Sequence, residues 1–160
     1  MRLLVVAVGR LKAGPERQLL SRYEERANKA GRAIGFRGLE LLEVDESRNR
    51  DPERRMIEES IAVLTLVPDK AALVLLDVKG ASLSSKDFAG VLAGWRDDGR
   101  PACVCVIGGP DGLAPALHDR ADLVLAFGAL TWPHQLVRIM LVEQLYRAVT
   151  ILSGHPYHRE

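Results

Sequence analysis

Short apolar runs rich in β-branched residues alternate along this chain with longer segments in which apolar residues recur every three or four positions. The short runs predict buried strands over residues 3–8, 39–44, 72–78, 102–109 and 122–127. The longer segments predict helices over residues 14–29, 52–66, 84–95, 115–119 and 134–152. Strands that are apolar throughout and alternate with helices are typical of a parallel sheet. The pattern therefore predicts an α/β fold, with a mostly parallel sheet covered by helices on both faces, in a single domain over residues 1–160.

Residues with clear preferences for helix termini mark several of the predicted helix starts. Asp51 stands directly before Pro52, which suits an N-cap followed by proline in the first turn. Ser84 or Ser85 provides a cap for the helix over 84–95. These signals support helices between the strands. Candidate functional residues are therefore expected in the loops.

Three loops follow the predicted strands 72–78, 102–109 and 122–127. Ligands of an open α/β sheet bind outside the carboxyl ends of its strands. The middle loop reads Gly-Gly-Pro-Asp-Gly over 108–112, where glycine allows the backbone to approach a ligand closely. It matches neither G-x-G-x-x-G nor the P-loop pattern, so it does not indicate a dinucleotide or triphosphate site. A plain strand-to-helix turn is the alternative.

The loop over 127–133 is apolar where polar residues are expected. Leu130 and Trp132 need cover from a ligand, a partner chain or the core. A loop that offers both apolar side chains and backbone donors suits a flat, partly apolar cofactor such as an adenosine. The helix over 134–152 is apolar almost all round, which is typical of a helix buried on several sides and indicates a subunit interface.

Composition and charge narrow the classes of partner. The chain is 48% hydrophobic and 27% charged, as in ordinary globular proteins, and its net charge is only +1. A nucleic-acid partner would therefore have to meet a local basic patch. The basic residues that could form such a patch, or only a solvated surface, are Arg10, Lys12, Arg48, Arg50, Arg54 and Arg55.

The cysteines and the N-terminal segment bear on the cellular setting. Cys103 and Cys105 share one face of a predicted strand, and two cysteines give neither a disulfide framework nor a zinc set. No signal-peptide pattern is present, and no apolar stretch approaches the roughly 20 residues of a membrane span. We expect a cytoplasmic protein that does not insert into a membrane.

The sequence ends in "GHPYHRE", which gathers aromatic, basic and histidine residues where chains usually fray. His155 and His158 would supply at most half of a metal site, so no metal centre is expected. A solvated tail, or a tail that folds back and completes a site, are the two remaining interpretations.

Five motifs in order make the chain recognisable: "VAVGRLK", "LLDVKGASLSS", "VIGGPDGL", "ALTWPHQLVRIMLVEQLYRA" and "HPYHRE". Together they closely resemble the RlmH family of SPOUT-superfamily methyltransferases over essentially the whole length. The resemblance implies the SPOUT fold with a deep C-terminal trefoil knot, the knot and cofactor region covering about residues 72–160. It also implies S-adenosylmethionine as cofactor, a homodimer as working unit, and methylation of N3 of a pseudouridine in 23S rRNA of the assembled 70S ribosome.

The resemblance also assigns candidate residues. The cofactor contacts it implies are Leu76, Gly108, Gly109, Phe127, Gly128, Ala129, Leu130, Thr131 and Trp132. The catalytic candidates are His158 as a base, Arg159 and Arg147 as cationic groups, and Tyr157 as a stacking platform for the target base. Arg138 and Glu143 are expected to tie the last helix to its neighbours. A SPOUT methyltransferase for another RNA such as tRNA, and an inactive ribosome-binding homologue, are the alternatives.

Overall fold

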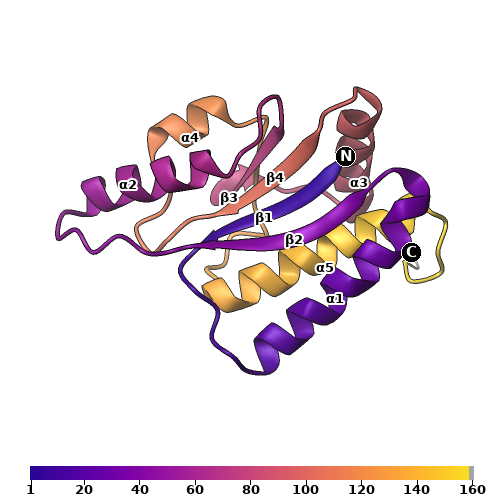
Figure 1. Cartoon of the computed structure of the whole chain (residues 1–160), viewed down its shortest axis with the longest axis horizontal. Helices are drawn as coiled ribbons and strands as arrows, with labels where there is room; N and C mark the ends of the chain where they lie inside the picture. Colours follow the sequence, from indigo (N-terminus) through magenta and orange to yellow (C-terminus); the bar gives the residue numbers. More distant parts are fainter. Residues whose placement is uncertain (159–160) are drawn as a thin grey trace.

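Five parallel strands form one sheet in the order β2–β1–β4–β3–β5, as seen in the computed structural model, which describes residues 1–158 (Figure 1). The strands are β1 (Arg2–Val8), β2 (Arg37–Val44), β3 (Ala72–Ala81), β4 (Ala102–Ile107) and β5 (Leu123–Leu125). The helices are α1 (Pro15–Gly31), α2 (Pro52–Thr65), α3 (Ser85–Asp97), α4 (Pro115–Arg120) and α5 (His134–Leu152), with a 3₁₀ turn at Arg32–Ile34. The predicted α/β fold with a parallel sheet is confirmed.

The predicted helix caps form where the sequence places them. The Asp51 side chain accepts a hydrogen bond from the backbone N–H of Glu53, and Pro52 fills the first position of α2. The Ser84 hydroxyl accepts from the backbone N–H of Asp87, so Ser84 and not Ser85 caps α3.

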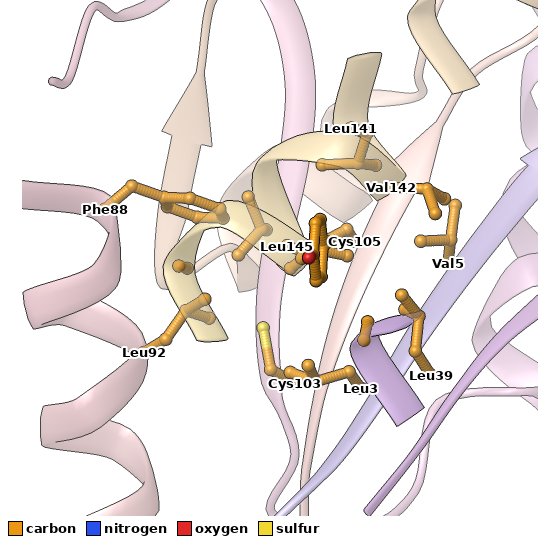
Figure 2. Packing of buried hydrophobic residues seen from close by; sticks show 14 of the residues in the cluster. Leu3, Val5, Leu39, Phe88, Leu92, Cys103, Cys105, Leu141, Val142 and Leu145 are labelled. Carbon is orange, nitrogen blue, oxygen red and sulfur yellow. The ribbon is translucent and has the colours of Figure 1, made fainter. Parts of the chain in front are cut away.

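Alternation along β1 divides the core into two layers. Leu3, Val5 and Ala7 point to one face of the sheet, where α1, α3 and α5 cover them. Figure 2 shows this layer, with Leu141, Val142 and Leu145 of α5 packed over the strands. The opposite face packs against α2 and α4, which lie together on the other side of the sheet in Figure 1. Helices therefore cover both faces, as predicted.

β3 and β5 differ in length from the strands predicted over 72–78 and 122–127. β3 continues to Ala81, past a register shift between Leu76 and Ala81, because Ala81 pairs with Leu125 after the irregularity. β5 is only three residues long, and the next backbone N–H, that of Ala126, donates to the carbonyl of Ala81. The end of β3 is thereby held against the loop that follows β5. The trefoil knot itself stays a prediction.

Candidate active site

The three loops expected to matter meet at the carboxyl ends of β3, β4 and β5 and enclose a cavity of about 370 Å³, the loop pocket. A volume in this range suits a small cofactor that is mostly buried. Leu76 comes from the end of β3, Gly108 and Gly109 from the loop after β4, and Phe127 from the loop after β5. The remaining lining residues from these loops include Asp77, Val78, Pro110, Asp111, Gly112, Gly128, Leu130, Thr131 and Trp132. Ala129, which the resemblance also implies, is not among them.

Residues 108–112, the glycine loop, form a tight turn at the floor of the pocket. The backbone N–H of Gly112 donates to the carbonyl of Gly109 at 3.0 Å, and Gly112 has a φ of 93°. A Cβ on Gly108 would lie 2.9 Å from both the Gly112 carbonyl oxygen and Cγ of Leu113. Glycine is therefore required at position 108 by the closeness of the turn.

The helix α2 braces the glycine loop from outside. The Arg55 guanidinium donates to both carboxylate oxygens of Asp111, at 2.6 and 2.9 Å, and this pairing lowers the pKa of Asp111. The Ser60 hydroxyl oxygen lies 3.3 Å from the backbone N–H of Ala114 and accepts its hydrogen bond. Sequence reasoning placed Arg55 among candidates for a basic patch and missed this role, since the ion pair joins residues far apart in the chain.

The third loop closes the pocket on its apolar side. The indole N–H of Trp132 donates to the carbonyl of Phe127 at 3.2 Å, which fixes the loop into a closed turn with Gly128 at a φ of 92°. Leu130 remains 70% exposed. The loop therefore presents an apolar surface both to the pocket and to the outside.

Beyond the exposed residues 153–156, the chain folds back, and Tyr157 and His158 are half-buried against α5 and α1. Tyr157 donates its hydroxyl to Oε1 of Glu143 at 3.0 Å, and its ring packs against Tyr146 with centroids 4.6 Å apart. Arg147 lies over the Tyr157 ring at 5.0 Å and donates twice to the same Glu143 oxygen. The residues Tyr23, Glu143, Tyr146, Arg147, Tyr157 and His158 are called the C-terminal cluster below.

Comparison with known proteins decides the family. The sequence matches the family described as "Predicted SPOUT methyltransferase" over residues 1–158. It is 58% identical over 159 residues to "Ribosomal RNA large subunit methyltransferase H" of Rhodopseudomonas palustris (strain BisB18), covering 99% of both chains. The chain belongs to the SPOUT methyltransferase family. The resemblance drawn from the five motifs is thus confirmed, and so is its implication that the protein is an enzyme.

Further relatives of this SPOUT methyltransferase carry the same name. The protein of that name from Bradyrhizobium sp. (strain ORS 278) is 56% identical over 159 residues, which cover 99% of this chain and 98% of the relative. Among solved structures, the SpoU methyltransferase AviRb from Streptomyces viridochromogenes in complex with AdoMet aligns with a TM-score of 0.40 and 12% identity. That alignment covers 92% of this chain and 59% of AviRb.

Within this SPOUT methyltransferase, the catalytic candidates and the cofactor candidates lie apart. None of Arg147, Tyr157 and His158 lines the loop pocket of the same chain. Burial, together with hydrogen bonds involving Tyr23 and Glu143, raises the pKa of Tyr157. Its hydroxyl is thus unsuited to act as a base near neutral pH. Arg159 lies outside the described residues.

Arg138 ties the last helix to its neighbours, as expected from the sequence, whereas the hydrogen bonds of Glu143 go to residues of its own helix and to Tyr157. Arg138 is 3% exposed and donates to the carbonyls of Val8 and Gly9 at 2.7 and 2.8 Å, beside Glu43. Burial lowers its pKa. It joins α5 to the end of β1, whereas Glu143 anchors Arg147 and Tyr157 of the C-terminal cluster.

The remaining expectations concern metals and membranes. Over residues 1–158, no group of three or more His, Cys, Asp or Glu side chains is arranged to hold a metal ion. No helix in this described range has the length and apolar character to cross a membrane. Cys103 and Cys105 are both buried and packed in the core.

Proposed function

We propose that this protein methylates N3 of a pseudouridine in the 23S rRNA of the assembled ribosome, with S-adenosylmethionine as methyl donor. The observation that carries the proposal is the match along 99% of the chain to relatives named ribosomal RNA large subunit methyltransferase H. The protein would work in the cytoplasm, because its substrate is the ribosome.

We place the cofactor in the loop pocket. The residues there fit it, because the glycine loop at Gly108 has no side chain to cover its backbone and the walls are largely apolar, as the adenosine half of the cofactor requires. Leu76 and Trp132 would flank the adenine, and backbone groups of the glycine loop would bind its edge. The bound cofactor supplies an electrophilic methyl group on a sulfonium.

The chain's own residues must then prepare the acceptor nitrogen. N3 of the target base carries a proton that it has to lose, which calls for a base or for cations that stabilise the anionic ring. His158 is the candidate base, because the hydrogen bond its ring makes among residues 1–158 is a long contact of 3.5 Å between Nδ1 and the Arg147 guanidinium. Arg147 and Arg159 would stabilise the negative charge, and the Tyr157 ring would stack on the base.

We further propose that two copies of the chain form the working enzyme. A second cavity of about 460 Å³ lies beside the loop pocket, between α1, α5 and the segment after β3. Three apolar residues are exposed on one chain: Leu19 at this cavity, Leu130 at the loop pocket and Leu136 on α5. A second copy would cover these residues. It would also bring its C-terminal cluster toward a pocket that the cluster of the same chain does not reach.

Transfer of tritiated methyl groups to 70S ribosomes, free 50S subunits and tRNA tests the substrate. We expect transfer to 70S ribosomes, at the N3 position of a pseudouridine. Transfer to tRNA and not to ribosomes would refute the proposal. An inactive homologue would bind ribosomes and transfer nothing to any of the three.

The Gly108→Val variant tests where the cofactor binds. The added side chain would clash with the Gly112 carbonyl and Leu113 and distort this wall of the pocket, so S-adenosylmethionine affinity should fall at least about tenfold, or roughly 1.4 kcal/mol. Isothermal titration calorimetry measures the S-adenosylmethionine affinity of the variant and of the wild type. Wild-type affinity in this variant would show that the cofactor binds elsewhere.

A further inference from the structure

The glycine loop is held by residues of α2 that do not themselves line the loop pocket. Every nitrogen of the Arg55 guanidinium is engaged. Nε and Nη2 donate to the Asp111 carboxylate, while Nη1 donates to the carbonyls of Asn49 and Arg50 at 2.9 and 3.1 Å. One planar side chain thereby joins the segment before α2 to the centre of the glycine loop. A lysine ammonium could not reproduce this fork.

A buried carboxylate supports the same loop one helical turn further on. Glu59 is 4% exposed and lies beneath Gly109, where its Oε2 would be 2.8 Å from a Cβ at that position. Its Oε1 accepts from the backbone N–H of Ser47, and its Oε2 has no hydrogen-bond partner among the described residues. Burial raises the pKa of this carboxyl. Ser60, the next residue of α2, accepts from the backbone N–H of Ala114, just beyond the glycine loop, so α2 contacts the loop and its continuation through Arg55, Glu59 and Ser60.

We propose that Arg55 is a positioning residue for cofactor binding, acting through Asp111 on the path of the glycine loop. A loop with three glycines in five residues loses much conformational freedom when it is fixed, and a ligand that has to fix it binds more weakly. The Arg55–Asp111 pair fixes the loop before the ligand arrives. The inference rests on the proposed placement of S-adenosylmethionine in the loop pocket.

The alternative role for Arg55, a contact with ribosomal phosphate, conflicts with its surroundings. Its charge is matched by Asp111 and its donors are used within the protein. The two roles predict different results. Loss of a phosphate contact would weaken ribosome binding and reduce its salt dependence while sparing cofactor affinity. Loss of a positioning contact would weaken cofactor binding and leave ribosome binding and its salt dependence unchanged.

The test compares S-adenosylmethionine affinity by calorimetry in Arg55→Ala, Asp111→Ala, the double Ala variant and the exchanged pair Arg55→Asp/Asp111→Arg. Each single change should weaken binding about tenfold, and the double should be no weaker than either single. The exchanged pair should recover part of the loss. Arg26→Ala, an exposed arginine on α1 across the sheet, is the matched control and should bind normally.

Two readouts separate a positioning role from general damage. The unfolding temperature of Arg55→Ala should stay close to that of Arg26→Ala, and the salt dependence of ribosome binding should be unchanged. Normal cofactor affinity in Arg55→Ala, with weakened affinity in Gly108→Val, would overturn this inference and leave the proposed function standing. Normal affinity in both variants would overturn the placement of the cofactor as well.

Discussion

Replacing Gly80 by alanine should disrupt the site more than any other single methyl group added to this chain. A Cβ there would lie 2.7 Å from the backbone N and C of Leu125 and from the backbone C of Val124. These atoms belong to β5, which is paired with β3 at Ala81, so neither side can withdraw without breaking the sheet edge. We expect a loss of stability of about 3 kcal/mol, the upper end of ordinary overpacking. Cofactor binding should be lost with it, because both clamped segments lead into the loop pocket.

Gly90→Ala is the matched control for this prediction. Gly90 lies within α3, and no atom outside the local helix lies within 4 Å of the position its Cβ would take. Alanine should therefore raise stability there by about 0.5–1 kcal/mol. Denaturant unfolding and calorimetry with S-adenosylmethionine on both variants provide the comparison. A Gly80→Ala protein as stable as the wild type would show that β5 can move away from β3.

Gly80 also illustrates what the sequence could and could not predict about the fold. The alternation of apolar runs and helical periodicity located all five strands and the five main helices. At the end of β3, however, the same pattern predicted a strand ending at residue 78, three residues short of Ala81. The extension to Ala81 depends on pairing with β5, a contact between segments far apart in the chain. Local periodicity carries no information about such pairing.

The candidate site, like the fold, has a part that the sequence predicted and a part that it did not. The rule that ligands bind at the carboxyl ends of strands predicted three loops, and these loops do enclose one pocket. The brace behind the glycine loop was not predicted. Arg55 and Asp111 are 56 residues apart, and each taken alone is an ordinary surface charge. Their pairing follows from the position of α2 beside the end of β4, which only the fold reveals.

The sequence left two interpretations of the C-terminal motif open, a solvated tail and a tail that folds back to complete a site, and the contacts of Tyr157 show that the motif folds back. Periodicity could not have located its partners, because the motif has no regular structure of its own. What holds it is Glu143, a residue that looked like a simple helix tie. One carboxylate oxygen accepts hydrogen bonds from both Arg147 and Tyr157, which joins two catalytic candidates to one point on α5.

Deleting residues 157–160 should abolish methylation while leaving cofactor affinity within about twofold of wild type. The deletion removes the candidate base His158 and the Tyr157 ring, and general acid–base groups alone contribute about a hundredfold or more to rate. Cofactor binding should survive because neither Tyr157 nor His158 lines the loop pocket. Single-turnover methylation of ribosomes and calorimetry measure the two quantities. Tyr157→Phe, which removes only the hydroxyl bonded to Glu143, is the control and should keep most of the activity.

Mixing two inactive proteins tests whether the tail serves the other copy of the chain. One protein lacks residues 157–160 and has an intact loop pocket, and the other carries Gly108→Val and has an intact tail. After subunit exchange, a mixed dimer combines the intact pocket of one chain with the intact tail of the other. If the tail acts across the dimer, activity should return on mixing, because the pocket and the C-terminal cluster of a single chain are separate. If mixing restores nothing although mixed dimers form, each tail serves its own pocket, and the tail would have to leave Glu143 to reach it.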